Sequence, residues 1–334
     1  MARLEWAELR RATSLSVLES RWLEPGWLAQ VEAWIRERGE VTGDLDQFHV
    51  RWWSTVIRVP SEGEDLYFKA VGQGFGFEPA LTAKLAALRP DRLPALIDVD
   101  LDRAWLLMRD GGRRLREVVS GPGDLRHWER ALPRYAELQL ASAPVVDELL
   151  DLGVPDARLS ALPTQLEDLL ARGVPGLEPG EHAQVVEALP ELESVCRDLA
   201  GYGVPETIQH DDLHDGQVFL TDGRYVFFDW GDACVSHPFH SLTVTLRATA
   251  ARLDLAPGGR EMRRLRDAYL EPFGELREAA NLAYRTGTVA RALAWDRFVR
   301  GGLAAGAEAD DELATAYGLK LFLARGPIGS WREP

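Results

Sequence analysis

The residues best suited to catalysis lie in one short segment, Ile208–Asp232. Within it, His210, Asp212, Gln217 and Asp229 follow one another in an order and at a spacing that suit phosphoryl transfer. That reaction needs a carboxylate to orient the attacking hydroxyl and oxygen ligands to hold magnesium on the nucleotide phosphates. We expect Asp212 to supply the carboxylate, and Gln217 and Asp229 to supply the metal ligands.

The local pattern predicts a β-hairpin that brings these groups together. An apolar run precedes the turn dipeptide Asp222-Gly223, which tolerates positive φ, and a β-branched and aromatic run follows it. In a tight hairpin the start of the first strand lies beside the end of the second, so Gln217 and Asp229 are expected to lie close together. Asp212 falls on the loop that leads into the hairpin.

The segment carries two motifs, His210-x-Asp212-x-His214-x-x-Gln217 and Asp229-Trp230-Gly231. Together they resemble the catalytic core of the aminoglycoside phosphotransferase family, a branch of the protein-kinase-like fold. The resemblance implies that Asp212 is catalytic and that His210 supports the catalytic loop. Gln217 stands where the family usually has Asn; it keeps the amide oxygen but adds a methylene.

Other interpretations of this segment are simpler. His210 and His214 have the spacing of a zinc pair on a helix, but Gly216 and the strand pattern argue against a helix there. Asp211 and Asp215 fit solvated loop acids better than metal ligands. Asp212 and Asp229 could also be plain surface acids. Against this, Asp229 directly follows an apolar strand, where a carboxylate without a partner is costly.

Lysine is rare in this chain, which makes one position conspicuous. Of the 38 basic residues only Lys69, Lys84 and Lys320 are lysines. Lys69 lies in the strand pattern Leu66–Val71. A compact ammonium group suits contact with nucleotide phosphates better than a planar guanidinium does. The alternative is an ordinary strand lysine with its amine in water.

A helix is predicted over residues 77–88, with Glu78 at its start. The resemblance pairs Glu78 with Lys69, whereas the alternative is that Glu78 only complements the helix dipole. The resemblance also places a hinge near Met108 and Asp110, with backbone available to an adenine ring.

No protein-kinase glycine-rich loop separates the first two predicted strands. Only a short turn with Ser54 and Thr55 lies there. These two hydroxyls are candidates for contact with the nucleotide phosphates. The alternative is that both are plain turn residues.

The pattern along the chain predicts a helical start, a group of strands and a long helical remainder. The strands are predicted at 48–53, 55–59, 66–71, 93–99 and 104–108 after a helical segment within 1–40. Helices are predicted at 128–140, 157–171, 183–199, 239–253, 259–269, 276–299 and 311–324. Trp105, Trp128 and Trp295 are expected to anchor the core. The fold class is α+β: a bilobal, protein-kinase-like fold with a small antiparallel-sheet lobe (1–109) and a mainly helical lobe (110–334).

Composition narrows the functional class. The 334 residues are 46% hydrophobic and carry a net charge of −15, which disfavours non-specific nucleic-acid binding. Neither a signal peptide nor a membrane span is expected, and the two cysteines, Cys196 and Cys234, form no disulfide framework. The simplest location is the cytoplasm. The sequence gives no indication of oligomeric state.

The expected function is ATP- and Mg²⁺-dependent phosphotransfer to a hydroxyl of a small polar molecule, such as an aminoglycoside or amino sugar. Asp211, Asp215 and Asp232 are expected near the acceptor, where they either attract an ammonium group or are only solvated or bound to loop backbone amides. Two rivals are a non-catalytic nucleotide-binding protein with a kinase fold, and a metal-dependent phosphohydrolase.

Overall fold

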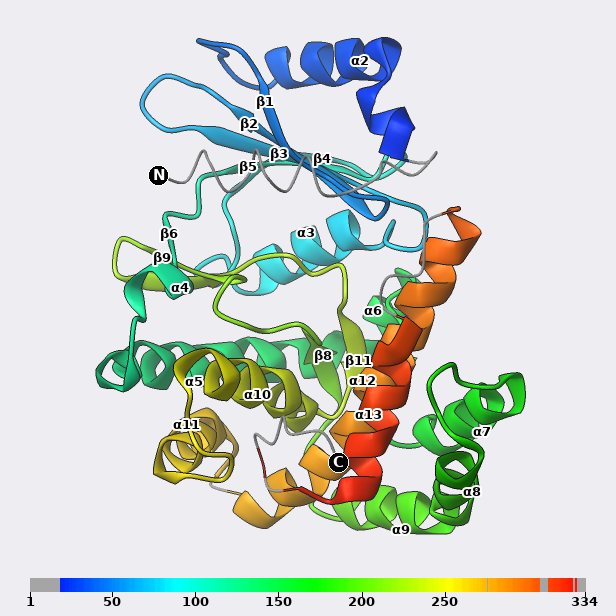
Figure 1. Ribbon diagram of the computed structural model, residues 1–334. Coiled ribbons are helices and arrows are strands. Elements are labelled where there is room, and N and C mark those ends of the chain that lie inside the picture. The colour runs from blue at the N-terminus through cyan, green and yellow to red at the C-terminus, as the bar shows by residue number, and fades with distance from the viewer. Residues whose placement is uncertain (1–18, 275, 307–311, 327, 329–334) are drawn as a thin grey trace.

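The computed structural model describes residues 19–274, 276–306, 312–326 and 328, which form a small sheet lobe and a larger helical lobe (Figure 1). The first described elements are a 3-10 helix, η1 (Glu19–Leu23), and α2 (Pro25–Arg36). Pro25 at the first turn suits its fixed φ. The helical segment predicted within 1–40 is therefore found in part, and residues 1–18 lie outside the described residues.

The small lobe is built on a five-stranded antiparallel sheet. Its strands are β1 (Asp46–Val50), β2 (Ser54–Val59), β3 (Leu66–Val71), β4 (Leu96–Asp100) and β5 (Trp105–Arg109), in the order β1-β2-β3-β5-β4. The predicted strands are confirmed with two corrections. The fourth strand begins at Leu96 rather than at residue 93, because Pro94 has no backbone N–H to pair. The first strand ends at Val50 rather than Trp53, because Trp52 and Trp53 lie in the turn, which Arg51 N closes by donating to Ser54 O at 2.9 Å.

The two faces of this sheet have different partners, and this difference orients Lys69. On one face, α2 packs its Trp34 edge-on against Phe68 and Trp105, with ring centroids 5.8 and 5.7 Å away. On the other face lies α3 (Glu78–Leu88), as Figure 1 shows. Successive side chains of a strand point to opposite faces, so Lys69, next to Phe68, points towards α3.

The predicted hairpin is present. Strands β9 (Val218–Thr221) and β10 (Arg224–Phe227) pair in register, and a short strand β6 (Arg113–Arg114) extends the ribbon. The turn residues Asp222 and Gly223 have φ of 48° and 76°, the positive values that the Asp-Gly dipeptide favours. A second small sheet, β7 (Asp156–Ala157), β11 (Cys234–Ser236) and β8 (Thr207–Gln209), holds the chain on either side of the hairpin.

The helical lobe contains α4 (Leu115–Val118), α5 (Arg126–Ser142), α6 (Val146–Asp151), α7 (Leu162–Arg172), α8 (Pro179–Glu187), α9 (Leu189–Ala200), α10 (Ser241–Leu253), α11 (Arg260–Leu270), α12 (Arg277–Ala304) and α13 (Glu312–Ala324). Short 3-10 helices lie at Pro122–Asp124, Ala143–Val145, Pro238–His240 and Glu271–Phe273. The single helix predicted over 183–199 is instead two, because the chain starts a new helix with Pro190 in its first turn. Residue 311, the predicted start of the last helix, lies outside the described residues.

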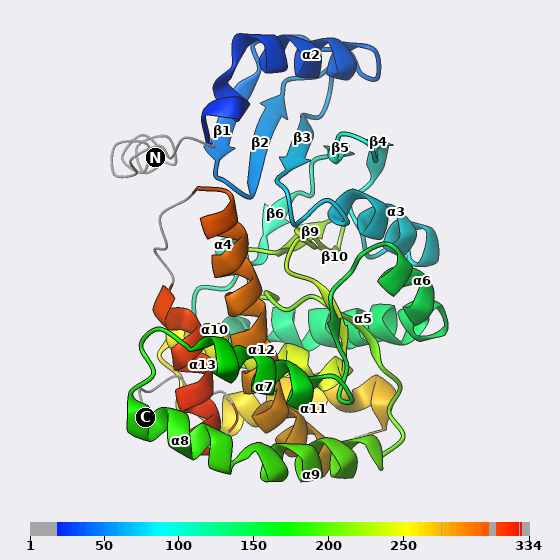
Figure 2. The ribbon, with the colours of Figure 1, turned by 90° about the vertical axis from the view of Figure 1, so that its right-hand side faces the viewer.

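The long helix α12 connects the two lobes. It rises through the helical lobe towards the sheet (Figure 2). Near its end, Gly301 and Gly302 lie against the ring of Trp52, and a Cβ at Gly302 would stand 3.1 Å from that ring. The turn between β1 and β2 is therefore seated on a notch in α12. Among the described residues, no helix is both long and apolar enough to cross a membrane.

Candidate active site

The residues singled out in the sequence meet where the sheet lobe faces the hairpin. Lys69 on β3 places its Nζ 2.6 Å from Glu78 Oε1 at the start of α3. The same Nζ lies 2.6 Å from Oδ1 of Asp229, directly after the hairpin. The structure thus brings Asp229 together with two residues of the sheet lobe, and it makes Glu78 a buried partner of the lysine rather than only a complement to the helix dipole.

The charges of Lys69 and Asp229 stabilise each other. Burial would lower the pKa of Lys69, but the carboxylates of Asp229 and Glu78 outweigh it and raise that pKa. Burial would raise the pKa of Asp229, but the Lys69 ammonium outweighs it and holds that pKa well below its usual range. Lys69 and Asp229 therefore remain an ion pair at neutral pH.

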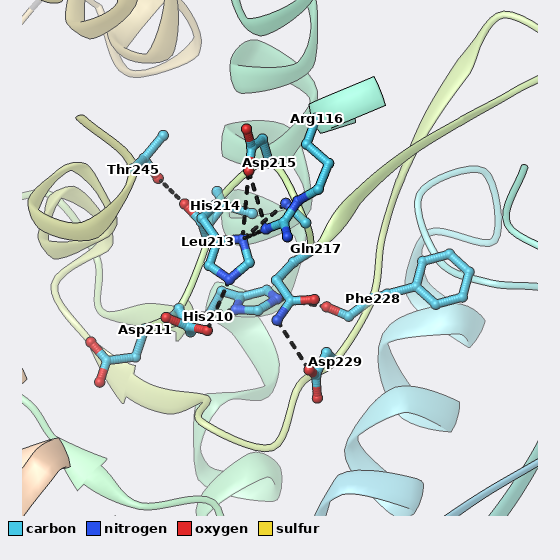
Figure 3. A network of polar contacts seen from close by, with 12 residues as sticks. Arg116, His210, Asp211, Leu213, His214, Asp215, Gln217, Phe228, Asp229 and Thr245 are labelled. Atoms are coloured by element: carbon cyan, nitrogen blue, oxygen red, sulfur yellow. Dashed lines mark hydrogen bonds and ion pairs between the residues drawn. The ribbon is translucent and has the colours of Figure 1, made fainter. Parts of the chain in front are cut away.

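Asp229 and Gln217 lie close together, as expected from the hairpin pattern in the sequence (Figure 3). Gln217 Nε2 donates to Asp229 Oδ2 at 3.0 Å. Turning the amide over would exchange Nε2 for Oε1 and place two oxygens beside one cation. Magnesium accepts such hard oxygens and usually takes only one or two ligands from protein, with water and phosphate oxygens completing its shell. The donor chemistry of the two side chains therefore fits Mg²⁺ bound with a nucleotide.

No group of three or more His, Cys, Asp and Glu side chains suited to a metal ion occurs in the described part of the chain. His210 and His214 are in a loop rather than on a helix, so the zinc-pair interpretation has no structural support.

Asp212 is held through both of its carboxylate oxygens. His214 Nε2 lies 3.4 Å from Oδ2, and Nη2 of Arg291, on α12, lies 3.2 Å from Oδ1. Burial would raise the pKa of Asp212, but the hydrogen bond from His214 and the charge of Arg291 lower it overall. Arg291 was not among the predicted site residues, since nothing in its local pattern distinguishes it from the other arginines.

His210 supports the loop and does not face the cleft. It is fully buried, and its Nε2 donates to the carbonyl oxygen of Phe228 at 2.7 Å (Figure 3). Its Nδ1 accepts from the Asp212 amide at 3.4 Å. One imidazole thus joins the loop of Asp212 to the residue before Asp229, which is a positioning role.

The two predicted loop acids are ion-paired. Asp215 contacts Arg116 at 3.3 Å (Figure 3) and Arg252 at 2.7 Å. Asp211 is buried and contacts Arg291 at 3.2 Å. Neither acid is solvated, and neither is free to attract a cation. Asp232, in contrast, has no hydrogen bond or ion pair to any described side chain, and it lines a cavity beside Asp212.

The larger cavity at the site has a volume of about 550 Å³ and lies between sheet and hairpin. Met108 and Asp110 line it as expected, as does Ser54. Asp110 is already engaged: its amide donates to Asp65 O at 3.2 Å, and its carboxylate accepts from Gly112 N at 2.7 Å.

Thr55 was predicted to contact the nucleotide phosphates, but the structure does not place it in the cleft. It is fully buried, and its hydroxyl donates to His49 O at 2.7 Å and accepts from Gln47 at 2.8 Å. Because strand side chains alternate, Thr55 points away from the cleft that Ser54 lines.

A second cavity, of about 320 Å³, adjoins the first and shares Lys69 and Asp229 with it. Its lining includes four aromatic side chains: Trp53, Phe75, Trp295 and Phe298. Trp295 was expected in the core, but it is only partly buried and lines this cavity, whereas Trp105 and Trp128 are buried as predicted. Asp212 lies on this cavity and not on the larger one, so the site consists of two adjoining cavities that differ in their lining.

Comparisons with known proteins agree with this geometry. The model of the phosphotransferase enzyme family (APH) matches residues 22–282. No curated protein sequence matches significantly.

Among solved structures, a choline/ethanolamine kinase family protein from Mesorhizobium loti is 20% identical, with a TM-score of 0.55 over 89% of this chain and 93% of its own. Macrolide 2'-phosphotransferase MphH from Brachybacterium faecium is 17% identical, with a TM-score of 0.57 over 87% and 97%. Choline kinase LicA from Streptococcus pneumoniae is 14% identical, with a TM-score of 0.58 over 87% and 99%. These similarities establish the kinase-like bilobal fold. Because the family match spans most of the chain, the protein belongs to the phosphotransferase enzyme family.

Proposed function

We propose that this protein transfers the γ-phosphoryl group of ATP to a hydroxyl of a small polar molecule that carries an amino group, such as an aminoglycoside or amino sugar. The observation that carries the proposal is the position of the Lys69–Asp229 pair, which lines both of two adjoining cavities, with Asp212 on the smaller one. One cavity takes the nucleotide and the other takes the acceptor, so the phosphoryl group would cross where they meet.

In this proposal each side chain has a definite task. Lys69, oriented by Glu78, contacts the nucleotide phosphates, with Ser54 and Met108 elsewhere in the nucleotide cleft. Asp229 and Gln217 would hold Mg²⁺, which neutralises phosphate charge when bound. Asp212 accepts a hydrogen bond from the acceptor hydroxyl and then its proton, while the hydroxyl oxygen bonds to the γ-phosphorus and the bond to the β–γ bridging oxygen breaks. The products are the phosphorylated acceptor and ADP.

Asp232 supports an acceptor with an ammonium group. Burial, reinforced by the charge of Asp212, raises the pKa of Asp232 to about 7. A cation bound beside it would favour its ionised form and restore an ordinary pKa. The aromatic side chains that line the same cavity suit a cation next to an apolar ring face. Among the similar structures, one is a GDP and kanamycin complex of APH(2")-IIia.

The proposal extends to location and organisation. We place the lobe boundary between residues 109 and 110, at the end of β5. We also place the protein in the cytoplasm. Cys196 and Cys234 are both free and buried, which suits that reducing compartment.

The decisive experiment measures ADP release with Mg²⁺ and either ATP or GTP across a panel containing kanamycin, glucosamine, choline, ethanolamine and uncharged sugars. We expect turnover with an amine-bearing acceptor and a kcat about 10²–10⁴-fold lower in Asp212→Asn, the usual contribution of a positioned acid–base group. Near-normal turnover in that variant would reject the role of Asp212. Nucleotide binding without phosphorylation of any acceptor would favour the non-catalytic alternative.

A further inference from the structure

Arg291 is a buried charge that the transfer chemistry above does not use. Only 9% of the residue is exposed. Its Nη1 lies 3.2 Å from Asp211 Oδ2 and its Nη2 lies 3.2 Å from Asp212 Oδ1. Its Cζ stands 4.8 Å from the ring centroid of Trp295, one turn further along α12. Two ion pairs and a ring therefore fix the plane of this guanidinium.

The loop is shaped to present two neighbouring carboxylates to Arg291. Adjacent residues in extended chain point in opposite directions, but Asp211 has a φ of 60°. Non-glycine residues rarely adopt this left-handed conformation, and it recurs at functional sites. The side-chain amide of Gln209 holds Asp211 in place: Nε2 donates to Oδ1 at 3.0 Å, and Oε1 accepts from the Asp211 amide.

The opposite side of the Asp212 carboxylate is held by its own loop. Gly216 N donates to His214 Nδ1 at 2.8 Å, so Nε2 of that ring carries the proton and faces Asp212 Oδ2. His214 thus restrains one oxygen from within the loop. Arg291 restrains the other from a separate and rigid element, α12.

We propose that Arg291 is a positioning residue for phosphoryl transfer: it holds the Asp212 carboxylate in the orientation that receives the acceptor hydroxyl. The inference rests on the proposed function, in which Asp212 orients that hydroxyl. A planar fork that bridges two carboxylates fixes a direction, which a single ammonium charge does not.

The charge of Arg291 has a second effect on Asp212. The titratable and charged groups around that carboxylate come from three places. His210, Asp211 and His214 belong to its own loop, Arg291 belongs to α12, and Lys69, Glu78, Asp229 and Asp232 line the same cavity. Burial raises the pKa of Asp212, and His214 and Arg291 lower it. Loss of Arg291 should therefore raise the pKa of Asp212 and move the acidic limb of the rate profile to higher pH.

The test uses the full chain with MgATP as the probe and water as the only acceptor. Phosphate release is measured against pH for wild type, Arg291→Gln, Arg291→Lys and a control, Arg300→Gln, which removes only an exposed pair with Asp296 on the same helix. In parallel, the carboxyl ¹³C signal of Asp212, assigned by its absence in Asp212→Asn, is titrated in each protein.

For Arg291→Gln we expect kcat to fall about 100-fold, the loss that a 1 Å misplacement can cause, with an unchanged KM for ATP. The ¹³C titration of Asp212 and the acidic limb should both move to higher pH. Arg291→Lys should keep the wild-type titration but recover only part of the rate. The control should match wild type.

Two outcomes would overturn the proposal: an unchanged rate in Arg291→Gln, or a slower rate with an unchanged titration of Asp212. Arg291→Gln could fail to fold because Asp211 is left buried without a partner. In that case the same measurements are made on the double variant Asp211→Asn/Arg291→Gln, which removes both charges. Failure of the proposed function would be distinct: wild type and Asp212→Asn would release phosphate equally, while the titration would still report whether Arg291 acts on Asp212.

Discussion

Lys69 and Asp229 are 160 positions apart in the chain, yet Nζ of the first lies 2.6 Å from Oδ1 of the second. One residue belongs to the sheet lobe and the other follows the hairpin of the helical lobe. Their ion pair therefore bridges the cleft between the two lobes. A nucleotide phosphate that binds Lys69 would compete with Asp229 for the same ammonium group and free Asp229 to bind a cation.

Replacing Lys69 with arginine should lower kcat about 100-fold, because the larger guanidinium cannot occupy the buried position between Glu78 and Asp229 without displacing groups by about 1 Å. ADP release under saturating ATP checks this. The matched control is Lys84→Arg, since Lys84 pairs with Glu148 at the surface. Equal activity in the two variants would show that Lys69 is only a strand residue.

Removal of Asp229 should abolish the dependence of ATP binding on magnesium. With ATP at about 100 times its Kd, the wild type should gain about 2.7 kcal/mol of unfolding free energy, and Asp229→Ala should lose the part of that gain that requires Mg²⁺. Thermal unfolding with and without the metal measures it, with Asp102→Ala, an exposed acid, as control. A magnesium-dependent shift that survives in Asp229→Ala would exclude Asp229 as a ligand.

Gln217 offers a finer test of the metal site. Gln217→Asn should remain active because the amide oxygen is kept, whereas Gln217→Ala should require more Mg²⁺ for half-maximal rate. The measurement is the rate of ADP release as a function of Mg²⁺ concentration. An unaltered magnesium dependence in Gln217→Ala would remove this side chain from the site, and inactivity of Gln217→Asn would show that the loop needs the longer side chain.

Asp232→Asn should change stability in a pH-dependent way. The pKa of Asp232 is raised to about 7 in the folded protein, against about 3.9 when unfolded. Between these values the unfolded state binds fewer protons, so the wild type loses stability as pH rises through this window. The variant should therefore match wild type near pH 4, about the unfolded pKa, and melt at a higher temperature at pH 8. Identical melting curves at both pH values would contradict the raised pKa.

Asp232→Asn also tests whether the acceptor carries an ammonium group. If an ammonium group binds Asp232, its KM should rise about tenfold in Asp232→Asn, equivalent to about 1.4 kcal/mol. The KM of the wild type should also rise with salt, because ions screen the attraction between the carboxylate and an approaching ammonium group over about 8–10 Å. A neutral acceptor with no salt dependence would leave the phosphotransferase assignment intact and remove the cationic one.

Local sequence determined much of this protein. The strand pattern and the Asp222-Gly223 turn were sufficient to predict the sheet and the hairpin. These signals act over a few residues through φ preferences and side-chain alternation, which a sequence displays directly. The roles proposed for Lys69 and Asp229 rest in addition on the resemblance of the motifs to a known family. The Asp212 loop was equally visible, because its motif is contiguous.

Only the tertiary structure decided which groups surround those residues. Thr55 points away from the cleft because one step along a strand reverses the face. Asp211 and Asp215 are not cation sites, because arginines from α12, α10 and α4 neutralise them. Arg291 reaches Asp212 from 79 positions away. Such partners are set by how helices pack against the loop, and a charge far along the chain leaves no trace in the local pattern of the residue it contacts.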